Sequence, residues 1–262
     1  MRYLSLLLIF SCTIASAQSP RQIPILTYHQ VRDWKAKDSK SDKDYMIPPA
    51  NFAAHIKMLA DSGCHTILPD ELISGGPLPS KPIMLTFDDT NEDQFKVSRP
   101  ILIKSHFKAV YFIITGKIST HKWFMNAQQI KQLSDEGNVI GCHTTSHLNF
   151  KKLTTNQFQT EIAQSKKTLE QITGKPVDFF AYPFGYWNRA GLPNLHQFGF
   201  KAAFQLDAPR DPTDQKMTIR RIVKRIPGAQ QFLTTRLNKA SVTGKESCRA
   251  FKNFKLNQRY SS

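Results

Sequence analysis

Short apolar strands and helical segments alternate along most of this chain, and no other feature of the sequence constrains the fold as strongly. Strands are expected at Ile23–Tyr28, Thr66–Leu68, Ile83–Phe87, Ala109–Thr115, Val139–His143, Val177–Tyr182 and Ala202–Leu206. Helices are expected between them at Asn51–Ser62, Glu92–Ser105, Ala127–Glu136, Thr155–Thr173 and Gly191–Phe198. Strand–helix alternation favours a parallel sheet, and its repetition indicates an α/β barrel.

The two ends of the chain differ from this alternating part. Residues 1–17 contain Arg2, an apolar stretch at 4–10 and small residues at 15–17, which together predict a signal peptide cleaved after Ala17. The apolar stretch is too short to anchor the chain in a membrane. We therefore expect an exported protein, periplasmic or extracellular, with no transmembrane segment in the mature chain. Its expected parts are a signal peptide at 1–17, a catalytic domain at 18–235 and a basic tail at 236–262.

Basic residues are concentrated toward the C-terminus. The chain has a formal net charge of +16, and Gln215 to Ser262 contains 12 Lys and Arg against one acid, Glu246. Such an excess predicts contact with an anionic cell-envelope surface; the alternative is a solvated, partly disordered tail. The signal sequence argues against nucleic acid as the substrate.

The cysteines do not form a complete disulfide set. Cys12 belongs to the predicted signal peptide, which leaves the odd number Cys64, Cys142 and Cys248. We expect Cys142 to be a small apolar filler on a buried strand. A bridge between Cys64 and Cys142 in an oxidising compartment stays open.

Two carboxylates follow one of the buried strands. The apolar run Ile83–Phe87 stops at Asp88 and Asp89. Acids in this place are also common as helix caps and turn formers, so the pair alone does not establish a site.

Two histidines follow another strand. His143 and His147 are spaced so that one helical turn would bring both onto one face. Solvent-facing histidines at this spacing need not bind anything. Combined with one Asp, however, they form a three-ligand metal set with room for water and substrate, which is typical of hydrolytic sites. The second Asp can then take a proton from that water.

These segments resemble the polysaccharide deacetylases with the NodB-homology fold, carbohydrate esterase family 4. Three motifs carry the resemblance in the family's order: Thr86–Asp89, His143–His147 and the strand and turn Phe179–Gly185. The resemblance implies a distorted barrel of about seven strands, with catalytic groups at the carboxyl ends of the strands. The segment Tyr28–Arg32 is similar to the opening strand of the branch that deacetylates poly-N-acetylglucosamine of biofilm matrix.

The resemblance also implies roles for individual residues. Asp89, His143 and His147 would bind a divalent ion, with Zn²⁺ expected and Co²⁺ or Ni²⁺ able to replace it. Asp88 would be the catalytic base. The backbone N–H of Phe184 would stabilise the oxyanion.

Three departures from the family pattern affect these roles. Thr90 replaces the usual Gly, so the turn after Asp89 is expected to avoid positive φ. Ala181 and Tyr182 stand where many members carry an Arg that orients the catalytic Asp, and we expect Arg220 or Arg221 to substitute for it. The late Leu-x-His motif is absent, because the last histidine is His196. This makes His29 the candidate general acid.

The expected reaction is removal of N-acetyl groups from N-acetylglucosamine residues of an acetylated glycan polymer, with matrix poly-N-acetylglucosamine favoured. The expected substrate-binding residues are Tyr182, Pro183, Tyr186, Trp187, Arg220 and Arg221, with Trp34 as a further candidate to stack on sugar. Two alternatives stay open: a peptidoglycan N-deacetylase, and a non-catalytic glycan-binding module that adheres to cell wall through its basic tail.

Overall fold

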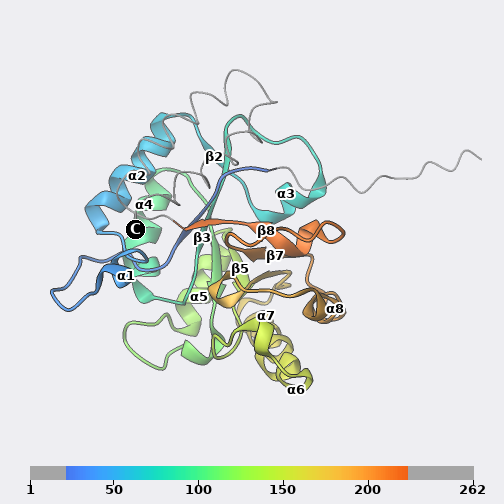
Figure 1. Ribbon diagram of the computed structural model, residues 1–262. Coiled ribbons are helices and arrows are strands. Elements are labelled where there is room, and N and C mark those ends of the chain that lie inside the picture. Colours follow the sequence, from blue (N-terminus) through green and yellow to red (C-terminus); the bar gives the residue numbers. More distant parts are fainter. Residues whose placement is uncertain (1–21, 224–262) are drawn as a thin grey trace, which may run out of the picture.

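The computed structural model describes residues 22–223, so the predicted signal peptide and the basic tail lie outside the described residues. Eight parallel strands form a nearly closed barrel surrounded by helices (Figure 1). Their order is β8-β7-β6-β5-β4-β3-β1-β9, and a short β2 pairs with β3 outside this path. The strands are β1 (Ile25–Tyr28), β2 (His65–Thr66), β3 (Pro82–Phe87), β4 (Val110–Ile113), β5 (Val139–Cys142), β6 (Phe179–Ala181), β7 (Ala202–Gln205), β8 (Ile219–Arg220) and β9 (Ile222–Val223). The predicted α/β barrel is confirmed.

The barrel closes at one residue. β8 pairs with β7 and β9 pairs with β1, while only Arg221 separates β8 from β9. The chain therefore crosses from one edge of the sheet to the other within a single short segment. Neither strand was predicted, since two residues carry no readable alternation of apolar and polar side chains.

Helices cover the outside of the barrel (Figure 1). They are α1 (Lys40–Lys43), α2 (Pro49–Asp61), α3 (Pro69–Ser74), α4 (Arg99–Lys104), α5 (Ala127–Asp135), α6 (Thr155–Phe158), α7 (Gln164–Thr173) and α8 (Leu192–Gln197). All five predicted helices are present. Two of them contain a π-helical turn, Gln94–Ser98 before α4 and Gln159–Ala163 between α6 and α7.

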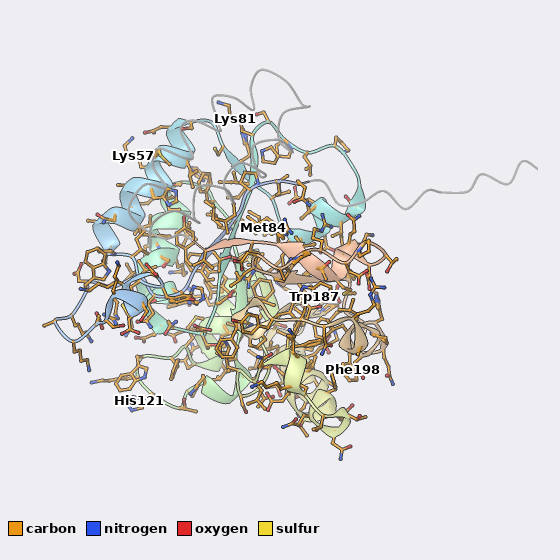
Figure 2. The ribbon with its side chains drawn as sticks, viewed as in Figure 1. Lys57, Lys81, Met84, His121, Trp187 and Phe198 are labelled. Carbon is orange, nitrogen blue, oxygen red and sulfur yellow. The ribbon has the colours of Figure 1, made fainter. Side chains whose placement is uncertain are left out.

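Alternate residues of the strands belong to two separate apolar clusters. One cluster gathers side chains that we assign to the barrel interior: Ile25, Met84, Val110, Phe112, Phe179, Ala181, Ala202, Phe204 and Ile219. The other lies between the strands and the helices and includes Leu26, Leu85, Tyr111, Ile140, Phe180, Ile56, Leu133 and Leu169. In Figure 2, Met84 lies among the packed side chains, whereas the exposed Lys57 and Lys81 lie at the periphery.

This alternation determines which polar residues reach the mouth of the barrel. Side chains alternate strictly along a strand, so every second residue faces the interior. The interior positions of β1, β3, β5 and β8 continue beyond the strand ends to His29, Asp88, His143 and Arg221. Four chemically active side chains are thereby directed to one end of the barrel.

Gly141 makes room inside the barrel. A Cβ atom at Gly141 would lie 2.5 Å from the Phe112 ring, closer than real side chains approach. The Phe112 ring in turn lies below Arg221, with the guanidinium carbon 5.0 Å from the ring centroid. Any larger residue at this position in β5 would displace the layer on which Arg221 rests.

Two cysteines lie within the described residues, and both are free thiols. Cys64 and Cys142 are buried and unbridged, so the disulfide that the sequence left open is not formed. Cys142 donates a hydrogen bond to the Ser165 hydroxyl at 3.3 Å. Over residues 22–223, no helix has the length and apolar character needed to cross a membrane.

Candidate metal and catalytic site

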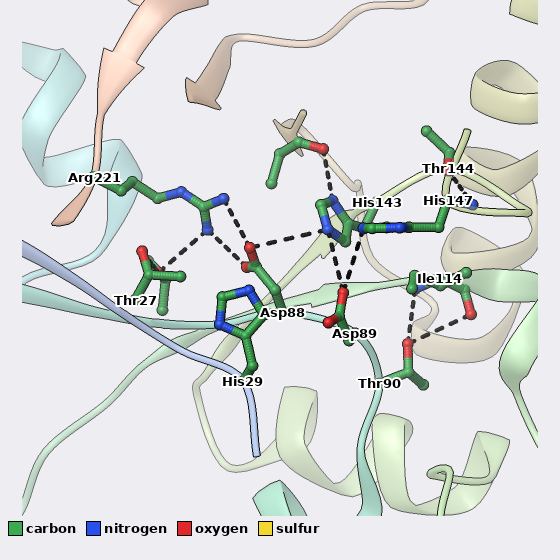
Figure 3. A network of polar contacts seen from close by, with 12 residues as sticks. Thr27, His29, Asp88, Asp89, Thr90, Ile114, His143, Thr144, His147 and Arg221 are labelled. Atoms are coloured by element: carbon green, nitrogen blue, oxygen red, sulfur yellow. Dashed lines mark hydrogen bonds and ion pairs between the residues drawn. The ribbon is translucent and has the colours of Figure 1, made fainter. Parts of the chain in front are cut away.

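The three predicted metal ligands meet at the mouth of the barrel. Asp89 follows β3, while His143 and His147 follow β5 (Figure 3). The Asp89 Oδ1 atom lies 3.6 Å from Nε2 of His143 and 3.5 Å from Nε2 of His147. One donor atom from each residue lies within 4.8 Å of the other two. This spacing suits a single divalent ion held by three protein ligands.

The chemistry of the donor atoms also fits a metal. His143 Nδ1 lies 2.7 Å from the backbone carbonyl oxygen of Ala181 and must donate its proton there, because a carbonyl only accepts. This leaves the lone pair of Nε2 directed toward Asp89, the tautomer that a metal ligand needs. Among the described residues, the buried Oδ1 of Asp89 has no hydrogen-bond partner. Such an unsatisfied carboxylate oxygen is costly unless a cation approaches it.

The two histidine ligands, His143 and His147, differ in how readily they bind a proton. Burial, and next the neighbouring His143, lower the pKa of His147 to about 4, which keeps it neutral and able to bind metal at physiological pH. Burial also disfavours charged His143, but the carboxylates of Asp89 and Asp88 outweigh this and raise its pKa. His143 therefore binds protons in competition with metal as the pH falls.

The segment between the two histidines is not the helical turn that the spacing predicted. Thr144 and His147 both adopt left-handed backbone conformations, with φ of 67° and 59°. The His147 N–H donates to the Thr144 hydroxyl at 2.9 Å, and the Ser146 N–H donates to the buried carboxylate of Glu161 at 2.8 Å. The histidines thus converge through an irregular loop that Glu161 and Thr144 hold in place.

The prediction that Thr90 avoids positive φ is wrong. Asp89 and Thr90 have φ of 76° and 64°, a conformation that strains a β-branched residue. The buried Thr90 hydroxyl accepts a hydrogen bond from the Ile114 N–H at 2.7 Å, and its carbonyl accepts one from the Met125 N–H at 2.9 Å. These bonds offset the strain, so a Thr can occupy the place where the family usually has Gly.

Asp88 and Arg221 form a buried, bidentate ion pair. The guanidinium donates to the two carboxylate oxygens at 2.7 and 2.8 Å, and both side chains are almost completely buried. Burial alone would raise the pKa of Asp88, but Arg221 and next His143 outweigh it and lower that pKa. Asp88 is therefore ionised and fixed in orientation, as a base must be.

The structure decides between the two arginines. Arg221 orients Asp88, whereas Nε of Arg220 donates to the carbonyl of Ala208 at 3.0 Å, away from the carboxylate pair. The expectation that Arg221 binds substrate is corrected accordingly, and the same expectation for Arg220 stays a prediction. Arg221 is only 3% exposed, and its Nη1 and Nη2 atoms are bonded to Asp88, whereas Arg220 is half-buried and bonded to the Ala208 carbonyl.

His29 lies beside the Asp pair, as predicted. Figure 3 shows its imidazole next to Asp88. Burial outweighs the opposing charges of Asp89 and Asp88, so the pKa of His29 lies below its ordinary value. Its Nδ1 atom is buried and has no hydrogen-bond partner within residues 22–223. This nitrogen is therefore not committed to another group of the described chain.

Gln94 ties His29 to Asp88, and no pattern in the sequence predicts this role. The buried amide Nε2 of Gln94 donates to the backbone carbonyls of both residues, to that of His29 at 2.7 Å. The ends of β1 and β3 are thereby held together beneath the site. Gln94 begins one of the two π-helical turns, and Glu161 belongs to the other.

The aromatic third motif divides into buried and exposed residues. Tyr182 is fully buried and its hydroxyl donates to the Met217 carbonyl at 2.8 Å, and Pro183 is buried as well. Their predicted contact with substrate is corrected for this reason. Phe184 and Tyr186 are each 53% exposed. Trp187 is half-buried against the core, and Trp34 lies 45% exposed on the loop after β1.

Removing either histidine ligand is expected to remove the metal. His143→Ala or His147→Ala leaves two protein ligands, so metal content after dialysis should fall to a small fraction of that of the unaltered chain, together with acetate release. Elemental analysis of the purified variants measures the metal. Full metal stoichiometry in either variant would show that the ligand assignment is wrong. His65→Ala, which removes an exposed imidazole outside the site, is the control.

Comparison with known proteins agrees with this geometry. The family model for polysaccharide deacetylase matches residues 75–203, which contain all three motifs. A putative polysaccharide deacetylase of Bacillus subtilis, YxkH, is 31% identical over 215 residues, covering 80% of this chain and 74% of the relative. The chain belongs to the polysaccharide deacetylase family. It is a polysaccharide N-deacetylase, a hydrolase of N-acetylated glycans.

Two further relatives extend this assignment. The poly-beta-1,6-N-acetyl-D-glucosamine N-deacetylase of Staphylococcus aureus is 26% identical over 206 residues, covering 70% of this chain and 71% of the relative. The structure of the deacetylase PplD of Streptococcus pyogenes superposes with a TM-score of 0.74 at 24% identity, over 83% of this chain and 99% of that one. The likeness to PplD shows the fold alone. Over most of its length the deacetylase is therefore similar in sequence to the staphylococcal enzyme and similar in fold to PplD.

Proposed function

We propose that this deacetylase acts on poly-N-acetylglucosamine of the matrix type, linked β-1,6. The observation that carries the proposal is the position of His29, which follows β1 in the segment Tyr28–Arg32 and lies beside Asp88. The 26% identity to the staphylococcal poly-beta-1,6-N-acetyl-D-glucosamine N-deacetylase supports the same substrate. Peptidoglycan is the alternative substrate, and it is an arm of the test below.

Asp89, His143 and His147 would hold the divalent ion, for which we propose Zn²⁺ because two imidazoles and one carboxylate are a common ligand set for this ion. When bound, the ion supplies Lewis-acid polarisation of the acetyl carbonyl and lowers the pKa of a water. The remaining steps belong to side chains and backbone of the chain itself.

Asp88 takes the proton from the attacking water. Arg221 keeps the carboxylate ionised and fixed in orientation, since two of its three guanidinium nitrogens donate to it. The N–H of Phe184 donates to the oxyanion that forms on the acetyl carbon. His29 then donates a proton to the departing sugar amine, so acetate leaves and a free amine stays on the polymer.

His29→Ala is expected to lower kcat by about tenfold or more, because a general acid typically contributes at least that much. Metal content should not change, since His29 is not a ligand. An acid must be protonated to act, so activity falls as the pH rises through the pKa of His29, and His29→Ala should flatten this alkaline limb of the profile. An unchanged kcat in the variant would refute the role and leave the amine to be protonated by solvent.

The substrate is tested by acetate release from three glycans. The purified chain, with and without added Zn²⁺, is incubated with β-1,6-linked N-acetylglucosamine oligomers, chitin oligomers and peptidoglycan. Release that is fastest from the β-1,6 oligomers and depends on metal supports the proposal. Faster release from peptidoglycan overturns the choice of polymer while leaving the deacetylase assignment intact.

We further propose that the enzyme is exported and that its basic tail contacts an anionic surface of the cell envelope. The support is the signal-like composition of residues 1–17 and the excess of basic residues after Gln215. An exported enzyme meets matrix polysaccharide where that polymer accumulates, which makes the location consistent with the proposed substrate.

A further inference from the structure

The order of strands places β1 and β6 opposite each other across the mouth of the barrel. From β1 the barrel runs to β6 through β3, β4 and β5 in one direction, and through β9, β8 and β7 in the other. Three strands intervene on each side. Residues at the carboxyl ends of β1 and β6 therefore lie on opposite sides of the barrel mouth, which are called the β1 rim and the β6 rim. The carboxylates and histidines of the site lie between these two sides.

An exposed aromatic ring stands on the β1 rim. The Tyr45 ring is 47% exposed and meets the His29 ring edge to face, with 4.9 Å between centroids and 79° between planes. Its backbone is tied to the end of β1, because the Gln30 N–H donates to the Tyr45 carbonyl at 3.1 Å. Tyr45 thus forms one wall beside the candidate general acid.

A matching pair of rings stands on the β6 rim. The Phe184 ring is 53% exposed and contacts the His147 ring at 4.5 Å between centroids. The Tyr186 ring follows at 6.2 Å from that of Phe184 and is equally exposed. His29 and His147, the histidines at the two ends of the cluster, therefore each lie beside an exposed aromatic ring.

The backbone of Phe184 turns its ring outward. Phe184 adopts φ of 60° between the buried Pro183 and Gly185. A left-handed conformation at a bulky residue is strained, and exposing its ring forgoes apolar burial. Strain of this kind at a functional site favours a ligand contact.

We propose that Tyr45 on one rim and Phe184 with Tyr186 on the other are two sugar-binding platforms, so that the glycan crosses the mouth from β1 to β6. The inference rests on the proposed function and names the residues that select the position of reaction. Pyranose rings present axial C–H groups that complement an aromatic face. With a platform on each side, the sugar that presents its acetamide to Asp88 and Asp89 is an internal one.

Two classes of readout test the platforms. The first is the position of the first acetyl group removed from a fully acetylated β-1,6 pentasaccharide, located by mass spectrometry. The unaltered enzyme should choose an internal sugar. Tyr45→Ala and Phe184→Ala should shift the position toward opposite ends, because sugars on the side of the lost ring no longer contribute to binding.

The second readout is the dependence of KM on chain length. Each alanine variant should raise KM for the pentasaccharide by roughly tenfold, the loss expected for one aromatic contact. KM for a disaccharide should change little, since a disaccharide can move to the remaining platform. Tyr45→Phe retains the ring and should behave as the unaltered enzyme does. Trp123→Ala is the matched control, because this ring is 52% exposed but stacks on His121 and not on a site histidine.

Binding separates this inference from the proposed function. Calorimetry with the pentasaccharide in an Asp88→Asn background measures the platforms without turnover. Weakened binding in the Tyr45→Ala and Phe184→Ala variants, with Trp123→Ala unaffected, supports the inference even if another glycan proves to be the better substrate. Unchanged pentasaccharide affinity and an unchanged position of reaction in both variants would overturn it.

Discussion

Asp88→Asn is expected to lower acetate release by about a hundredfold to ten-thousandfold while the metal stays bound. An amide cannot accept the proton of the attacking water, although it keeps the size of the carboxylate. Asp88 contacts Arg221 and is not one of the three grouped donor residues, so the metal site should survive the change. Acetate release and elemental analysis on the same preparation measure the two effects.

Asp89→Asn is the matched comparison for this variant, since it makes the same chemical change one residue away. It should weaken metal affinity, because Oδ1 of Asp89 faces both histidine nitrogens. The two variants therefore differ in metal content although both lose activity. Loss of metal in Asp88→Asn together with retention in Asp89→Asn would exchange the roles of the two acids.

Arg221→Met is expected to destabilise the fold by about 3–5 kcal/mol, the usual effect of removing one partner of a buried ion pair. The Asp88 carboxylate would stay buried without its cation, and the residue that closes the barrel would lose its contacts with Thr86 and Asp88. Denaturant unfolding of the metal-loaded protein measures the change. Arg220→Met, one residue away and bonded only to a loop carbonyl, should have a much smaller effect.

The pH dependence gives a second measurement for the same pair. Arg221 lowers the pKa of Asp88, so the stability contributed by this carboxylate is present above the pKa of unfolded Asp and is lost as the pH falls through the folded pKa. Without Arg221, burial dominates and the pKa of Asp88 rises. The acid limb of the rate profile should therefore move to higher pH in Arg221→Lys, which retains a charge but not the bidentate geometry. An unmoved acid limb would show that Asp88 is not the base.

Much of the candidate site was predictable because it depends on local patterns. The apolar run before Asp88 and the spacing of His143 and His147 predict strand ends, and parallel strands bring such ends to one edge. The alternation of side chains then directs His29, Asp88 and His143 to the barrel mouth. Neither step requires knowledge of distant contacts.

The local backbone was harder to predict than the donor set. The His143–His147 spacing suggested a helical turn, but the structure has an irregular loop held by Glu161. Thr90 adopts the positive φ that its side chain disfavours, because Ile114 and Met125 bond to it from other segments. In both cases, hydrogen bonds from elsewhere in the chain outweigh the local preference of the residue.

By itself, the sequence determined the alternating strands, the metal-binding donors and the carboxylate that accompanies them, since each is specified by neighbours along the chain. Only the tertiary structure decided that Arg221 and not Arg220 orients Asp88, that Gln94 joins the ends of β1 and β3, and that the Tyr45 ring lies against His29 and the Phe184 ring against His147. These relations depend on closing the barrel, which brings β9 against β1 and places residues far apart in sequence in contact. Barrel closure is a property of the whole sheet, and no short segment of the sequence encodes it.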